Sequence, residues 1–244
     1  MILLAILIGL SRLPKIEHTH QTTNKGQDSI WHHPNLTLGA IGIFAYVGAE
    51  VSIGSFLVNY FGAPEIANLP EKTAAGFVSF YWGGAMVGRF LGAALLRQFK
   101  PSRILAVSAV FAGILVIVSM MSGGQPAMWT ILSVGFFNSI MFPTIFSLGV
   151  AELGPLTGDG SGALNMAIVG GAILPVIRGF IADRIGIHHA FILPVLCYLF
   201  ILYYGLSGSN PTANATWPPR SGGTLWWPSL FILSLLKGSA HWLP

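Results

Sequence analysis

The stretch from Ile104 to Ala151 contains no charged residue, and this feature limits the fold more than any other. A transmembrane helix needs about 20 mostly apolar residues, so the stretch is too long for one span. The turn-forming run from Ser122 to Pro126 divides it into two. Only 8% of the 244 residues are charged, against about 25% in soluble domains. The sequence therefore predicts an integral membrane protein in a lipid bilayer.

Six apolar segments in all are long enough to cross a membrane. Short separators rich in Pro, Gly, Asn, Ser or charge favour turns between them. The predicted spans are residues 36–60, 77–97, 102–122, 126–151, 161–182 and 188–207. The predicted fold class is therefore an all-α membrane protein, a bundle of six transmembrane helices.

The two ends of the chain differ from this bundle. Residues 1–10 are apolar but too short to span, and we interpret them as the remnant of a preceding transmembrane helix. Residues 11–35 form a hydrophilic linker with three basic residues. Residues 209–244 begin with a segment rich in Ser, Pro, Gly and Asn and end with a short apolar run. We expect this tail to be disordered or to lie at the membrane interface.

Basic residues in short loops predict the orientation, because Lys and Arg are enriched in cytoplasmic loops. If the linker is cytoplasmic, the loop between the second and third spans is cytoplasmic as well. These two segments hold six basic residues, whereas the opposite side holds Lys72 and Arg184. The bias predicts that both the N-terminus and the C-terminus are cytoplasmic.

Glu50 lies in the middle of the first span, where an ionisable residue is costly and is a functional candidate. Tyr46 precedes it by four residues, so the two side chains share a helical face. One interpretation is a polar stripe that faces a cavity and binds a substrate or a proton. The alternative is a structural carboxyl group hydrogen-bonded to a neighbouring helix.

Two other spans carry amides. Asn138 precedes Phe142 by four residues in the fourth span, and an amide beside an aromatic ring is a common way to hold a sugar. Asn138 alternatively ties two helices together. Asn165 in the fifth span has the same two interpretations, and the structural one is favoured for it.

Four further charged residues are candidates for gating or for charge networks at helix ends. Arg178 and Asp183 lie five residues apart towards the end of the fifth span. Arg89 lies inside the second span, where it either extends towards the headgroups or pairs with a carboxylate. Arg97 belongs to the basic loop that follows.

Several classes of protein are not indicated. No Walker loop, His-Glu-x-x-His pair or nucleophile elbow appears, so the chain is not expected to be an enzyme. The single cysteine, Cys197, excludes an internal disulfide framework. The basic residues form no aromatic-interleaved stripe for nucleic acid. We expect no cofactor and no bound metal.

Four segments carry a family resemblance. The run from Tyr46 to Tyr60 resembles the seventh helix of the sugar/proton symporters of the major facilitator superfamily, in the subgroup of L-fucose permease and glucose/galactose transporters. Residues 137–149 resemble the tenth helix of that subgroup, and residues 165–175 resemble the eleventh. Arg89 and Arg97 match the basic loop between helices eight and nine, although Leu96 stands where an acidic residue is usual.

Such transporters have twelve helices in two halves, with the substrate between them. The resemblance covers residues 11–208 and matches only the second half of such a transporter. It implies a location in the bacterial inner membrane. It implies a monosaccharide substrate such as L-fucose, glucose or galactose, and symport of a proton or sodium ion by alternating access. The residues implied to face the sugar are Tyr46, Glu50, Asn138, Phe142 and Asn165.

Three alternatives remain open for a chain of this kind. In the first, the chain is part of a transporter that a separate N-terminal half completes. In the second, it is a truncated, transport-inactive membrane protein or a structural subunit. A homodimer of two such halves is the third.

Overall fold

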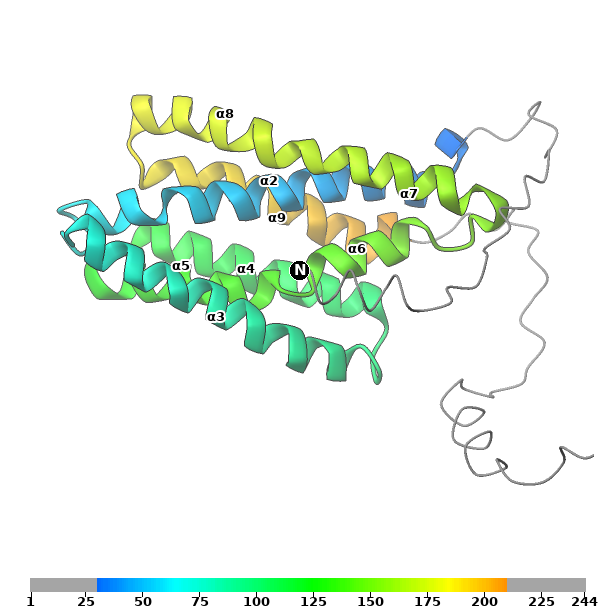
Figure 1. The fold of residues 1–244 in the computed structure, drawn as a ribbon, viewed down its shortest axis with the longest axis horizontal. Helices are drawn as coiled ribbons and strands as arrows, with labels where there is room; N and C mark the ends of the chain where they lie inside the picture. Colours follow the sequence, from blue (N-terminus) through cyan, green and yellow to red (C-terminus); the bar gives the residue numbers. More distant parts are fainter. Residues whose placement is uncertain (1–29, 210–244) are drawn as a thin grey trace, which may run out of the picture.

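The computed structural model describes residues 30–209, which form an antiparallel bundle of helices (Figure 1). The helices are α2 (Pro34–Gly62), α3 (Glu71–Leu95), α4 (Pro101–Met121), α5 (Gly124–Asn138), α6 (Met141–Gly149), α7 (Thr157–Met166), α8 (Gly170–Ile185) and α9 (Ile192–Tyr203). Short helical turns are η1 (Ile30–His32), η2 (Gly154–Leu156), η3 (Ala167–Val169), η4 (His189–Phe191) and the π-helical η5 (Tyr204–Gly208). The remnant helix, most of the linker and nearly all of the tail predicted above lie outside the described residues.

Prolines set several of the helix boundaries. Pro34 and Pro101 stand in the first turns of α2 and α4, where a missing N–H group and a fixed φ angle suit a helix start. Helix α2 ends at Gly62 because Ala63 precedes Pro64 and takes an extended conformation. The predicted spans 36–60 and 102–122 lie within two residues of α2 and α4 at each end.

Five helical segments of the described part are long and apolar enough to cross a membrane. They are Pro34–Gly62, Pro101–Met121, Gly124–Gly149, Gly154–Ile185 and His189–Gly208. The remaining predicted span, 77–97, falls in α3, whose 25 residues extend about 37 Å at the usual rise per residue. This length exceeds the bilayer core of about 30 Å, so α3 is long enough to span. The glycines and Arg89 of α3 lower its mean hydropathy, and α3 is therefore not among the five segments. The predicted all-α membrane fold is confirmed.

The fourth and fifth spans are not continuous helices. Helices α5 and α6 meet at Ser139 and Ile140, because Pro143 has no N–H group to donate to the carbonyl of Ser139. The fifth span likewise passes from α7 through η3 into α8. Interrupted helices are tolerated at membrane depth where the freed backbone groups are enclosed by protein or line a cavity. The α5–α6 break is therefore a candidate position for a functional site.

Helix α2 packs against α3, α6, α8 and α9, and α5 packs against α3 and α4. Glycine allows the closest approaches, as small residues do in membrane helix pairs. A Cβ atom added to Gly88 of α3 would overlap the carbonyl oxygen of Phe136, and one added to Gly135 of α5 would overlap that of Tyr81. The close packing of α3 against α5 therefore requires a residue without a Cβ atom at both positions.

We expect Gly88→Ala to destabilise the bundle by about 1–3 kcal/mol, the usual cost of overpacking a core. Gly83→Ala is the matched control on the same helix, because a Cβ atom there meets nothing within 4 Å. Thermal unfolding of the purified chain in detergent measures both. Equal melting temperatures for the two variants would contradict close α3–α5 packing.

Candidate functional site

A cavity of about 510 Å³ lies where α2, α3 and the α5–α6 break meet, and we call it the α2–α3–α6 cavity. The residues of interest on its wall are Tyr46, Glu50, Arg89, Ala93, Ser139 and Phe142. Three of the five residues predicted to face a sugar are therefore brought together in one place. Arg89, predicted as a gating or helix-end charge, lies there too.

Glu50 and Arg89 are the two charged groups of the cavity wall. Glu50 lies one turn beyond Tyr46 on α2 and is partly buried, whereas Arg89 extends from α3 with an exposed side chain. The oxygens of a carboxylate accept hydrogen bonds, and the N–H groups of a guanidinium donate them. The cavity can thus accept and donate hydrogen bonds at the same time.

Two aromatic rings stand beside these charges. The centroids of the Tyr46 and Phe142 rings are 6.3 Å apart, and the rings are tilted by 50°. The Tyr46 hydroxyl donates to the backbone oxygen of Asn138 at 2.9 Å, so this ring is held in place. Phe142 is half-buried at the cavity wall, directly after the helix break. The site therefore combines charge with apolar ring surface.

Asn138 lies outside the cavity lining and is completely buried. Its Nδ2 atom donates to the Tyr81 hydroxyl at 3.0 Å, and its Oδ1 atom accepts from the Tyr198 hydroxyl at 2.8 Å. These bonds tie α5 to α3 and α9, which corresponds to the helix-tying interpretation. A direct contact between Asn138 and a ligand requires one of them to open.

Tyr81 and Tyr198 are not among the five residues predicted to face a sugar, yet both are buried and hydrogen-bonded to Asn138. Together with Tyr46 and Asn138 they form a polar network that joins four helices. The available signal was chemical: a tyrosine buried within an apolar span needs a partner for its hydroxyl group. The network fixes the backbone on which the α2–α3–α6 cavity is built.

We expect Asn138→Ala to destabilise the chain by about 1–3 kcal/mol, because it leaves two tyrosine hydroxyls without their partner. Asn165→Ala is the matched control. Asn165 is exposed on α7, away from the cavity lining, and its loss should change stability by less than about 0.5 kcal/mol. Thermal unfolding in detergent compares the two. Equal shifts would contradict the network.

Arg178 is completely buried between α8 and α2. Its guanidinium carbon lies 3.8 Å from the centroid of the Phe191 ring and 4.6 Å from that of Phe56, and Nη1 donates to the backbone oxygen of Ser52. Asp183 is exposed near the end of α8. Arg178 is thus held by rings and a carbonyl group, away from the α2–α3–α6 cavity.

The predicted gating or helix-end residues therefore fall in four different surroundings. Arg89 lies in the cavity and Arg178 in the core. Arg97 is exposed just after α3 and Asp183 near the end of α8, and these two helix ends lie at opposite ends of the bundle (Figure 1). Within residues 30–209, no group of three or more His, Cys, Asp or Glu side chains is placed to hold a metal ion.

Similar proteins and similar solved structures are sugar transporters. No family model matches the chain. It is 50% identical over 208 residues to a glucose/galactose transporter of Brucella abortus, covering 85% of this chain and 50% of that protein. It is 33% identical over 224 residues to the L-fucose-proton symporter of Escherichia coli, covering 87% and 50%.

A crystal structure of the major facilitator superfamily transporter FucP in the outward conformation superposes with a TM-score of 0.75 at 31% sequence identity. The match covers 84% of this chain and 51% of that one. The chain thus spans about half the length of the relatives that it matches. It is homologous to about half of a major facilitator superfamily sugar transporter, in the group of the glucose/galactose transporters and the L-fucose-proton symporter.

Proposed function

We propose that this chain supplies one sugar-facing surface of a cation-coupled monosaccharide transporter, as its C-terminal six-helix half. The observation that carries the proposal is the α2–α3–α6 cavity, in which Glu50, Arg89 and the Tyr46–Phe142 ring pair meet. A sugar presents hydroxyl groups around its edge and C–H groups on its ring faces. Charged hydrogen-bonding partners beside aromatic surface match both.

Each group has a role in this proposal. The Glu50 carboxylate accepts hydrogen bonds from sugar hydroxyls, and the Arg89 guanidinium donates to hydroxyl oxygens. The Phe142 ring packs on a face of the sugar. Asn138 acts mainly through Tyr46 and Tyr81, whose positions it fixes. Asn165, exposed on α7, faces the partner half or the sugar path.

The second half of the site comes from another six-helix bundle. In transporters of this architecture the two bundles rock around a substrate held near the middle of the membrane. We propose a hexose or 6-deoxyhexose as substrate, because the relatives are named for glucose, galactose and L-fucose. A proton is the proposed coupling ion, since one relative is a proton symporter; sodium is the alternative.

We also propose that both chain ends face the cytoplasm of a bacterial inner membrane. The start of α2, the α3–α4 loop and the α6–α7 connection lie at one end of the bundle (Figure 1). Arg97, Lys100 and Arg103 gather in and beside that α3–α4 loop. Basic residues in short loops favour the cytoplasmic side.

Cysteine labelling tests the orientation. We expect a membrane-impermeant maleimide to react in intact cells with Asn68→Cys in the α2–α3 loop, and with Gln98→Cys in the α3–α4 loop only after permeabilisation. Both positions are exposed. The native Cys197 is buried and should contribute little background. Labelling of Gln98→Cys but not of Asn68→Cys in intact cells would show that the orientation is the opposite of the proposed one.

Sugar uptake tests the function. The chain is expressed alone, and also as a chimera in which it replaces the matching half of the Brucella abortus glucose/galactose transporter. We expect the chimera to take up labelled galactose or glucose in cells that lack their own carriers. A chimera that inserts into the membrane but shows no uptake above background contradicts the proposal.

The alternative is a transport-inactive membrane protein or structural subunit. The observation that favours it is the half-length match to the relatives. The same experiment separates the two proposals. An inactive chain with an active chimera means that the site is competent but incomplete, whereas two inactive proteins favour the alternative. Uptake by the chain alone points to a homodimer.

A further inference from the structure

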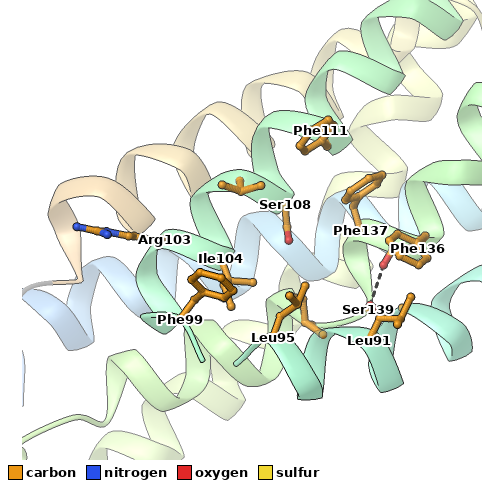
Figure 2. Close-up of a pocket in the computed structure, with 14 residues that line it drawn as sticks. Leu91, Leu95, Phe99, Arg103, Ile104, Ser108, Phe111, Phe136, Phe137 and Ser139 are labelled. Atoms are coloured by element: carbon orange, nitrogen blue, oxygen red, sulfur yellow. Dashed lines mark hydrogen bonds between the residues drawn. The ribbon is translucent and has the colours of Figure 1, made fainter. Parts of the chain in front are cut away.

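A second cavity, of about 400 Å³, lies between α3, α4 and the end of α5, and we call it the α3–α4 cavity (Figure 2). Its wall is almost entirely apolar and includes Leu91, Leu95, Phe99, Val107 and Phe111. Ser139 and Ile140 separate it from the α2–α3–α6 cavity, because they line both. Nothing in the proposed sugar transport uses this second space.

The α3–α4 cavity opens on the outer surface of the bundle. Leu91, Val107 and Phe111 line it and are each about half exposed, at 52%, 53% and 48%. The Phe111 ring stacks on the Phe137 ring with centroids 5.1 Å apart, and these two rings form the wall at that end. An open apolar surface on a membrane-spanning bundle contacts lipid chains. If the crevice stayed empty, the side chains that line it would lose dispersion contacts.

The cavity also has a charged end. Arg103 is the single charged residue on its wall, and it lies at the opposite end from Phe111 (Figure 2). Arg97 and Lys100 are exposed nearby in the loop that joins α3 to α4. A basic end at the membrane surface and an apolar interior match the two parts of an anionic lipid. Basic pockets between membrane helices on the cytoplasmic side are known to take such headgroups.

We propose that the α3–α4 cavity binds an anionic phospholipid, with one acyl chain along the apolar wall and the phosphate on Arg103. Charge complementarity selects this occupant over an apolar helix of a partner bundle, which gives Arg103 no counter-charge. In the proposed orientation the α3–α4 cavity faces the cytoplasmic leaflet, where anionic lipids concentrate.

Native mass spectrometry of the purified full chain tests the proposal, by titration with phosphatidylglycerol and with phosphatidylcholine of the same acyl chains. We expect tighter binding of phosphatidylglycerol. Arg103→Gln should weaken it about five-fold, the equivalent of about 1 kcal/mol per basic residue near an anionic headgroup. Arg184→Gln, an exposed arginine on α8, is the matched control and should change nothing.

A second variant tests the acyl-chain part. Val107→Trp fills the crevice and should weaken the binding of both lipids. The proposal is overturned if Arg103→Gln has no effect, or if Arg103→Gln and Arg184→Gln weaken binding equally, which indicates diffuse attraction. It is also overturned if glycerol phosphate, which has no acyl chain, displaces the lipid at comparable concentration, or if Val107→Trp leaves both lipids bound as before.

Discussion

Glu50→Ala in the chimeric transporter is expected to lower sugar affinity by about 10–100-fold. A hydrogen bond to a charged group contributes about 1.5–3 kcal/mol, and each 1.4 kcal/mol is a factor of ten in binding. Glu50 is the only carboxylate on the wall of the α2–α3–α6 cavity, so no neighbouring acid replaces it. The concentration dependence of galactose uptake measures the effect.

Two comparisons make this prediction specific. Glu65→Ala removes an exposed carboxylate from the α2–α3 loop and should leave uptake unchanged. Glu50→Gln keeps a hydrogen-bond acceptor without the charge, so its affinity should fall between those of the parent chimera and Glu50→Ala. Parent-like affinity in Glu50→Ala would exclude the proposed sugar contact and favour a structural carboxyl group.

Phe191→Ala is expected to have the largest effect on stability, about 3–5 kcal/mol. Phe191 is completely buried, and removal of a buried aromatic ring leaves a cavity with that cost. Its ring also lies against the Arg178 guanidinium at 3.8 Å and against the Tyr60 ring at 4.9 Å. Unfolding in mixed detergent micelles measures the difference.

Phe180→Ala is the control for this prediction, because its ring on α8 is 68% exposed. It should change the free energy of unfolding by less than about 0.5 kcal/mol. A double-mutant cycle with Arg178→Met isolates the contact between cation and ring. We expect a coupling of about 2 kcal/mol for this desolvated pair. Additive single mutants would show that Arg178 and the ring do not stabilise each other.

The bundle was predictable because the bilayer imposes simple rules on length and polarity. The uncharged run from Ile104 to Ala151 had to contain two spans, and prolines such as Pro101 do stand near helix starts. The interruption between α5 and α6 was not predicted. Its cause was already visible in Pro143, but hydropathy averages over a window and does not register a missing N–H group.

The candidate site was predictable in part, for a related reason. Helical spacing placed Tyr46 and Glu50 on one face, and both line the α2–α3–α6 cavity. Spacing within one helix says nothing of partners on other helices. The bonds from Asn138 to Tyr81 and Tyr198 span 57 and 60 residues of sequence. They depend on how α3, α5 and α9 pack, so the sequence alone left both interpretations of Asn138 open.

Protection of a cavity cysteine by sugar tests whether the α2–α3–α6 cavity holds the substrate. Ala93 lines this cavity with an exposed side chain, so Ala93→Cys in the chimera can be alkylated by a maleimide. Gln98→Cys in the α3–α4 loop serves as the unprotected control. We predict that galactose slows alkylation at position 93 several-fold, that L-glucose does not, and that Glu50→Ala removes the protection. Equal alkylation rates with and without galactose, in a chimera that still transports it, would show that the sugar binds elsewhere.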